Sequence, residues 1–187
     1  IAVIDSDNKK LVCHKAEGKL KNLKHKLDKK IISGSLGIGH TRWATHGKPV
    51  LKNAHPHCDS TKQVAVVQNG IIENYLELKT KLESEGVVFT SETDTEVIPH
   101  LVQKELHNLS KLNLENSGST LLIAVRNVIS DLEGAYALAV IWSGSPDSLV
   151  VARKQAPLII GLGEGEFVCA SDTPAITNIT NTILPME

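Results

Sequence analysis

The order in which strand-like and helical patterns follow one another constrains the fold of this 187-residue chain most. The first third contains the strand-like runs IAVID, KLVCHKA, SLGIGHTRWAT and QVAVVQN. Helical patterns dominate residues 73–132, and four strand-like runs, AYALAVIW, SLVVARK, PLIIGLG and EFVCAS, then predict an antiparallel meander. Helices grouped between runs of antiparallel strands predict one α+β layered domain over residues 1–187.

Local signals mark each expected helix. Residues 17–30 carry leucines at helical spacing among lysines, which predicts an amphipathic surface helix with a solvated basic face. ENYLELKTKLESEG predicts a second helix with Gly86 beyond its end, and VVFTS predicts a strand after it. A third helix begins at Thr93, whose T-x-x-E spacing with Glu96 predicts a capping box, and a fourth covers about 119–132.

The composition excludes several classes of protein. Apolar residues make up 41 % and charged residues 22 % of the chain, which is typical of a globular protein rather than a disordered one. A net charge of −1 gives no basic footprint for nucleic acid or anionic lipid, and no apolar run is long enough for a transmembrane helix. Three cysteines without a C-x-x-C pair indicate a reducing compartment, so we expect a cytoplasmic protein without nucleic-acid or membrane partners.

The stretch GHTRWATHG gathers polar groups at the end of an expected strand. Arg42 lies there with Trp43, Thr45 and His46, and its guanidinium would suit a carboxylate, although an arginine on the solvent face of a strand is the simpler interpretation. Asp94 begins a helix, where it complements the helix dipole. If Arg42 and Asp94 shared a cavity, they would hold the two charged ends of a free amino acid.

Asn69 and Gly70 close a buried strand. They form either a simple turn or an oxyanion hole, in which the Asn69 amide and the Gly70 backbone N–H stabilise a carbonyl oxygen that gains negative charge. Zinc is a possibility because His55, His57 and Cys58 lie near His40 and His46 in the sequence, but no ligand pair at a known spacing occurs among them. We therefore expect no metal and no cofactor, and we expect His55 to order its loop by hydrogen bonds.

Seven stretches in this order resemble one known family. They are GHTRWATHGKP, NAHPH, VVQNGIIENYLELK, SETDTEVIPHLV, DLEGAYALAV, ARKQAPLIIGLG and ASDTPAI, and together they cover most of the chain. The resemblance is to the class II glutamine amidotransferase domains of the glutamine–fructose-6-phosphate aminotransferases. It implies an N-terminal-nucleophile hydrolase fold, a four-layer αββα sandwich of antiparallel sheets. It also implies that a cysteine thiolate attacks the side-chain amide of L-glutamine and releases ammonia.

The resemblance assigns roles to the residues selected above. Arg42 would hold the α-carboxylate of glutamine, Asp94 would bind the α-ammonium, and Asn69 and Gly70 would form the oxyanion hole. The site would be completed by Trp43 as a closing side chain and by Thr45 and His46 as further contacts. C-terminal sugar-isomerase domains of the same full-length chain would receive the ammonia, and the full-length protein would be a homodimer.

One departure from the family pattern affects activity. The family begins its mature chain with Cys-Gly-Ile, and this start is absent, so we expect the segment as given not to hydrolyse glutamine. We also expect the absent piece to supply a central strand, leaving an unpaired sheet edge. Two alternatives remain: a non-catalytic glutamine-binding or structural module, and a metal-dependent hydrolase that uses the histidine-rich loop.

Overall fold

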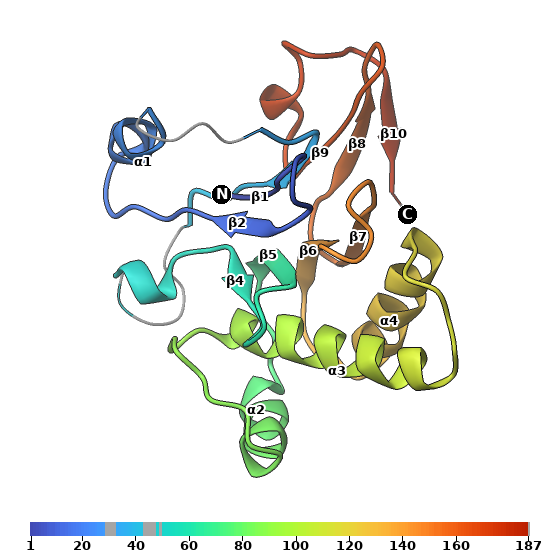
Figure 1. Cartoon of the computed structure of the whole chain (residues 1–187). Helices are drawn as coiled ribbons and strands as arrows, with labels where there is room; N and C mark the ends of the chain where they lie inside the picture. Colours follow the sequence, from blue (N-terminus) through green and yellow to red (C-terminus); the bar gives the residue numbers. More distant parts are fainter. Residues whose placement is uncertain (29–32, 43–47, 49, 187) are drawn as a thin grey trace.

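A four-stranded antiparallel sheet lies at the centre of the molecule (Figure 1). This computed structural model describes residues 1–28, 33–42, 48 and 50–186. The strand order is β4-β5-β6-β7, with bounds His57–Cys58, Val64–Gly70, Tyr136–Trp142 and Leu149–Lys154. β5 and β6 pair along their full lengths, from Val64 opposite Trp142 to Gly70 opposite Tyr136. Both strands are nearly continuous apolar runs because both faces of this sheet are covered.

Three helices cover one face of the central sheet (Figure 1). They are α2, α3 and α4, with bounds Tyr75–Ser84, Val97–Lys111 and Gly118–Ser130, and the 3₁₀ turn η2 (Asp94–Glu96) leads into α3. Alternate residues of β6, Leu138, Val140 and Trp142, point into the apolar core that these helices share with the sheet. Gly86 adopts φ +92 beyond the end of α2, as its position in the sequence predicts.

Two three-stranded sheets form the second layer on the opposite face. One has the order β2-β1-β3, with bounds Leu11–Cys13, Ala2–Ile4 and Leu36–Ile38, and the other has the order β10-β8-β9, with bounds Ile183–Pro185, Ile159–Leu162 and Phe167–Ala170. The first sheet packs Ala2, Ile4 and Ile38 against the central sheet. Short 3₁₀ turns occur at η1 (Leu51–Asn53) and η3 (Thr173–Ala175).

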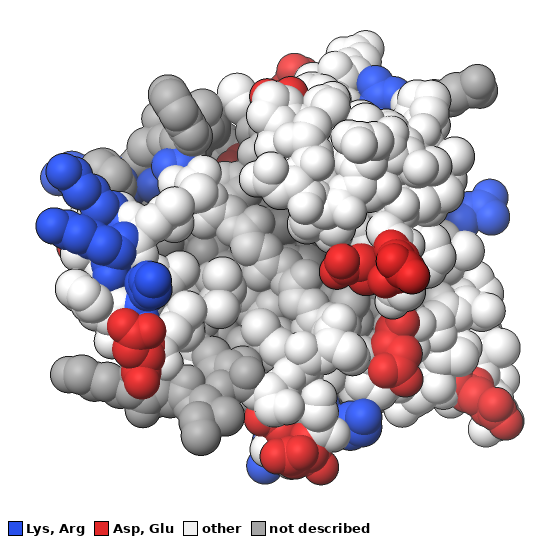
Figure 2. All heavy atoms as spheres, turned by 90° about the horizontal axis from the view of Figure 1, so that it is seen from above, with Lys and Arg blue, Asp and Glu red and all other residues white. Residues whose placement is uncertain are grey.

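Helix α1 (Leu20–Leu27) lies beside the second layer and buries none of its residues, as expected for a lysine-rich surface helix. Figure 2 shows basic side chains gathered on the side of α1 with an acidic group directly beside them, further acidic side chains on the opposite side, and a depression without charged side chains between the two sides. The layers confirm the expected α+β sandwich of antiparallel sheets. In the part of the chain that the structure describes, no helix is both long and apolar enough to cross a membrane.

The predicted meander of four late strands is wrong at one point. β6 pairs with β7 and β8 pairs with β9, but β7 and β8 belong to different layers. The chain changes layers where Gln155 takes a left-handed backbone conformation (φ 62) and Pro157 offers no N–H to a ladder. Leu158 then packs against Ala137 on the second-layer side of the central sheet.

Glu96 explains two further corrections. Its buried carboxylate accepts hydrogen bonds from the backbone N–H groups of Thr90 (2.8 Å) and Ser91 (2.6 Å) and from the Thr90 hydroxyl. Because these N–H groups are bonded to the carboxylate, they are not available to a strand ladder, and the predicted strand VVFTS does not form. The predicted capping box is also wrong, because Glu96 reaches residues 90 and 91 and the Thr93 hydroxyl contacts His57 instead (3.0 Å).

The strand expected over SLGIGHTRWAT is much shorter than its sequence indicates. β3 ends at Ile38, and Arg42 lies beyond it with φ 36, a backbone conformation that a strand cannot contain. Trp43, Thr45 and His46 lie outside the described residues. The segment between β3 and β5 contains the short strand β4, and the buried Asp59 holds the β4–β5 turn by accepting from the N–H groups of Gln63 and Val64.

Candidate functional site

Asn69 and Gly70 lie at the end of β5, and Asn69 lines a cavity of about 500 Å³. Gly70 has φ +98, and a Cβ atom at this position would lie 2.0 Å from the carbonyl oxygen of Ala135. Only glycine fits here, because any side chain would collide with the neighbouring backbone. The end of β5 can thus lie close against β6 and still present the exposed Asn69 to the cavity.

His40 connects Arg42 to Asn69 and fixes the orientation of the asparagine amide. The Arg42 backbone N–H donates to His40 Nδ1 (2.8 Å), so this nitrogen must be an acceptor. The proton of the neutral ring is therefore on Nε2, which donates to Asn69 Oδ1 at 2.8 Å. Since Oδ1 is used in this way, the Asn69 amide nitrogen remains to donate to another group.

Burial keeps His40 in the neutral form that this relay requires. Desolvation lowers the pKa of His40, and the nearby Arg42 charge lowers it further, against a smaller opposing effect of the hydrogen bond to Asn69. The sequence singled out His40 only as a metal candidate, so its positioning role was missed. The sequence signal that could have indicated this role is the position of His40, two residues before Arg42.

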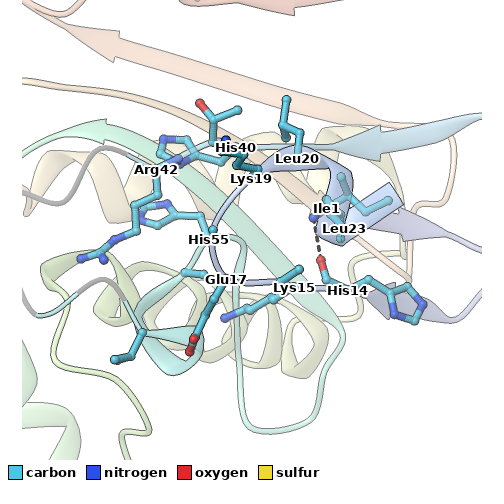
Figure 3. A pocket seen from close by; sticks show the side chains of 15 residues that line it. Ile1, His14, Lys15, Glu17, Lys19, Leu20, Leu23, His40, Arg42 and His55 are labelled. Carbon is cyan, nitrogen blue, oxygen red and sulfur yellow. Dashed lines mark hydrogen bonds between the residues drawn. The ribbon is translucent and has the colours of Figure 1, made fainter. Parts of the chain in front are cut away.

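Arg42 lines a second, smaller cavity of about 230 Å³ (Figure 3). His40 and Thr41 line both this cavity and the one at Asn69, so they form a shared wall. The Arg42 side chain donates from Nη1 to the Lys48 carbonyl oxygen (3.2 Å), and His55 lies close to it in Figure 3. Arg42 and Asn69 are therefore neighbours through His40 but line two cavities, not one.

Asp94 is buried, with 4 % of its surface exposed, and accepts the Ile72 backbone N–H at 2.8 Å. It thus lies beside the chain just beyond Gly70 and does not cap a helix. η2 is fixed to β5 by the Thr95 hydroxyl, which donates to Gln68 Oε1 (2.7 Å). Asp94 is absent from the described lining of both cavities, although its element packs on the strand that carries Asn69.

The two histidines of NAHPH hold the loop to the central sheet. His55 Nδ1 accepts the Gln68 N–H (3.3 Å), which confirms the expected loop-ordering bond, and His55 stacks on His40 with ring centroids 4.3 Å apart. Desolvation by burial lowers the pKa of His55 to about 2 and that of His57 to about 3. Among residues 1–28, 33–42, 48 and 50–186, no three His, Cys, Asp or Glu side chains are grouped to hold a metal.

The cavity at Asn69 lies between the two sheets of the second layer. Gly39, His40 and Thr41, which follow β3, line one side, and Cys169 and Ala170 of β9 line another. β3 and β9 each stand at the end of their sheet's strand order. The edges of two sheets, at β3 and at β9, therefore border the cavity that Asn69 lines.

Comparisons with known proteins agree with these features. Residues 40–178 match the family described as "Glutamine amidotransferase domain". The chain is 56 % identical over 177 residues to a protein named glutamine–fructose-6-phosphate aminotransferase (isomerizing) from Thermosynechococcus vestitus, covering 95 % of this chain and 27 % of that protein. It is 57 % identical over 175 residues to the protein of the same name from Nostoc sp., covering 94 % and 27 %.

Solved structures give the same result for the fold. Glutamine phosphoribosylpyrophosphate amidotransferase from B. subtilis, complexed with ADP and GMP, superposes with a TM-score of 0.76 at 29 % identity, covering 98 % of this chain and 38 % of that chain. This chain spans about 27 % of the length of the curated relatives named above. It belongs to the glutamine amidotransferase domain family.

Proposed function

We propose that this chain binds L-glutamine and forms the glutaminase half of a glutamine–fructose-6-phosphate aminotransferase. In the complete enzyme, ammonia from glutamine would serve the conversion of fructose 6-phosphate to glucosamine 6-phosphate. The names of the relatives at 56 % and 57 % identity support this substrate assignment. C-terminal sugar-isomerase domains, a homodimeric full-length protein and a cytoplasmic location belong to the same proposal.

The observation that carries the proposal is the relay from Arg42 through His40 to Asn69. It turns the asparagine Oδ1 toward His40, and so the amide nitrogen is free to donate to a carbonyl oxygen of the ligand. When that oxygen gains negative charge, a preorganised donor of this kind is worth about 3 to 4 kcal/mol in the transition state. In this role Asn69 acts together with the Gly70 backbone N–H.

Charged groups at both ends of the amino acid would provide the binding specificity. The Arg42 guanidinium would pair with the α-carboxylate through two parallel hydrogen bonds, and Asp94 would accept from the α-ammonium. Among the described residues, the Ile72 N–H donates a hydrogen bond to the Asp94 carboxylate. A carboxylate can accept several hydrogen bonds, so Asp94 can also accept from a ligand. Trp43, Thr45 and His46 would add the remaining contacts, as the resemblance implies.

The attacking thiolate would come from a cysteine-bearing strand outside these 187 residues. Cys169 lines the Asn69 cavity, but burial raises the pKa of its thiol, and it lacks the free α-amine that serves as internal base. The absent strand would fit between β3 and β9, whose edges border the cavity. Its thiolate would add to the amide carbon and expel ammonia, leaving a thioester that water hydrolyses to glutamate.

Calorimetric titration with three ligands tests the two-ended clamp. Glutamine, 4-aminobutanamide (no carboxylate) and glutaramic acid (no amine) would each be titrated into the wild-type chain, Arg42→Gln and Asp94→Asn. We expect each substitution to weaken glutamine binding by roughly 10- to 150-fold, because it removes a charged hydrogen bond. Arg42→Gln should leave 4-aminobutanamide unaffected, and Asp94→Asn should leave glutaramic acid unaffected.

Glu92→Gln is the matched control, because Glu92 is an exposed carboxylate bonded to Lys52. If both substitutions weaken all three ligands equally, the clamp is wrong and the residues act only through the fold. Binding of glutamine without ammonia release by the complete natural protein would instead favour the non-catalytic module.

An ammonia-release assay tests the source of the nucleophile. The 187-residue chain should release no ammonia from glutamine, whereas a longer natural form that carries the cysteine strand should release it. If the short chain is active, Cys169→Ser decides whether its own thiol performs the attack. Loss of activity in that variant would refute the external strand.

A further inference from the structure

Cys13 and Cys58 face each other across the two layers of the molecule. Cys13 is the last residue of β2 and Cys58 is the last residue of β4. Both are half-buried and pack against the same apolar cluster between the layers. The Cys13 sulfur also lies 4.0 Å from the carbonyl oxygen of Pro56, two positions before Cys58. The two thiols thus meet although 44 residues lie between them in the sequence, counting from 14 to 57.

The pair is open to small solutes. Both cysteines line a cavity of about 500 Å³ that does not share residues with the lining of the Asn69 cavity. Lysine ammonium groups at Lys15 and Lys62 lie on this cavity together with the thiols. The other titratable groups that face it are His57, Asp59, Glu96 and His100.

The surroundings favour a thiolate at one of the two positions. A hydrogen bond from the Cys58 thiol lowers the pKa of Cys13 to about 6, against the opposing effect of burial, and the charge of Lys15 lowers it further. The hydrogen bond to Cys13 raises the pKa of the Cys58 thiol, and burial and the negative charge of Cys13 raise it further. Cys13 is therefore the nucleophile of the pair, and Cys58 is its protonated neighbour.

We propose that Cys13 and Cys58 form a redox modification site, in which hydrogen peroxide converts the two thiols into a disulfide that joins β2 to β4. The Cys13 thiolate attacks one peroxide oxygen, so that an S–O bond forms, the O–O bond breaks, and the leaving hydroxide takes a proton to become water. The Cys58 sulfur then attacks the sulfenic sulfur of Cys13, forming the S–S bond and releasing a second water. Overall, two thiols lose two electrons and two protons, and one peroxide becomes two waters.

The disulfide would couple the layers that carry the two ends of the His40–Asn69 hydrogen bond. β2 belongs to the sheet that ends in β3 and leads to His40, and β4 pairs with β5, which carries Asn69. Closing the chain between residues 13 and 58 also restricts the unfolded state. Oxidation should therefore raise the melting temperature, and a dithiol reductant should restore the original value.

Intact mass and peptide mapping test the proposal on the wild-type chain. After dilute hydrogen peroxide, we expect the monomer to lose two hydrogen atoms and to yield a linked Cys13–Cys58 peptide pair that a reductant separates. Recovery of both residues as free thiols would overturn it, as would a linkage to Cys169 or a disulfide between two chains.

Alkylation by iodoacetamide across pH adds a second measurement. In the wild type, Cys13 should react with an apparent pKa near 6, and Cys58→Ser should move it toward the ordinary thiol value. The same variant should accumulate a sulfenic acid that dimedone captures, because the second thiol is gone. Cys169→Ser is the matched control and should leave both results unchanged. An ordinary Cys13 profile in the wild type would contradict the assigned nucleophile.

Discussion

The two faces of the central sheet are stabilised in different ways. On the helical face, the apolar core contains 20 buried residues of the described chain, drawn mainly from the helices and from β5 and β6. On the face toward β1–β3, the corresponding cluster contains six. Buried polar groups gather at the β4 edge of the sheet, where Asp59, His57 and Glu96 anchor loops by hydrogen bonds.

The difference shows where a fold of this kind places chemistry. Apolar packing dominates the helical face, and its buried polar groups, such as Glu96 and His100, lie near the start of α3 beside β4. The opposite face receives the loop segment that carries His40 and Arg42, and Cys13 and Cys58 pack against its apolar cluster. Stability at the β4 edge should therefore respond to pH and to oxidation, whereas the apolar interior of the helical face should not.

Two substitutions at neighbouring residues should show the largest difference in stability between the two faces. Val66 points into the helical core and Val67 points to the other face, where it also lines the Asn69 cavity. We expect Val66→Ala to lower the free energy of unfolding by about 2 to 4 kcal/mol and Val67→Ala by clearly less. Urea titration measures both, and equal losses would mean that the two cores contribute alike.

Loss of the Glu96 charge should have the next largest effect. Burial raises the pKa of this carboxyl, but the combined hydrogen bonds from Ser91 and Thr90 outweigh it and lower the pKa overall. A folded-state pKa below the unfolded one stabilises the protein above the unfolded value, and this stabilisation is lost as the pH falls through the folded value. Glu96→Gln should cost about 1.5 to 3 kcal/mol at neutral pH.

The control for that substitution is Glu83→Gln, since Glu83 is a surface carboxylate 3.9 Å from Lys79. It should change the free energy of unfolding much less, because exposed ion pairs are weak. Similar losses in both variants would show that the hydrogen bonds from Thr90 and Ser91 to Glu96 contribute little to stability.

His57 should make a smaller, pH-dependent contribution to stability at the β4 edge. Its pKa is lowered to about 3 by burial, so between this value and the unfolded value near 6.5 the unfolded state binds more protons. Stability should then fall with acidification by up to about 1.4 kcal/mol per pH unit for this group. His57→Gln should reduce the slope below pH 6.5, as followed by chemical denaturation at several pH values.

His107→Gln provides the comparison for the histidine experiment, because His107 is exposed on α3 over the helical face. Its slope should match that of the wild type. An unchanged slope in both variants would place the acid sensitivity elsewhere.

The smallest effect is expected at Val88, a strand-forming residue in a segment that is not a strand. It is 77 % exposed, and the segment is anchored by Glu96 at residues 90 and 91. Val88→Thr should change the free energy of unfolding by less than about 0.5 kcal/mol. Urea denaturation measures the change. A loss above about 1 kcal/mol, twice the expected limit, would reveal a packing role for the segment VVFTS.

The sequence predicts the helical side of this molecule well. Apolar runs and turn signals locate β5, β6 and the three helices, because apolar periodicity reports directly on burial. The hairpin of β1 and β2 and the outer position of α1 also follow from local pattern. Asn69, Gly70 and Asp94 are found close to the same strand end, although their roles in catalysis and binding stay predictions.

The misplaced elements share one physical cause. The strand over VVFTS, the capping box at Thr93 and the long strand through Arg42 are each replaced by a hydrogen bond that involves a side chain. Glu96 accepts from the N–H groups of residues 90 and 91, His57 contacts the Thr93 hydroxyl, and His40 accepts from the Arg42 N–H. Local propensity describes backbone preferences and does not include such side-chain partners, and the His57–Thr93 contact forms only in the folded chain.

The hydrogen-bond relay through His40 has a consequence for the polarity of the site. The asparagine amide in one layer takes its orientation from a backbone N–H in the other. If residues 39–42 separated from β5, the amide of Asn69 could rotate by half a turn and present its oxygen where its nitrogen had been. The pocket would then keep its shape but present an acceptor oxygen to the anion that the proposed function places there.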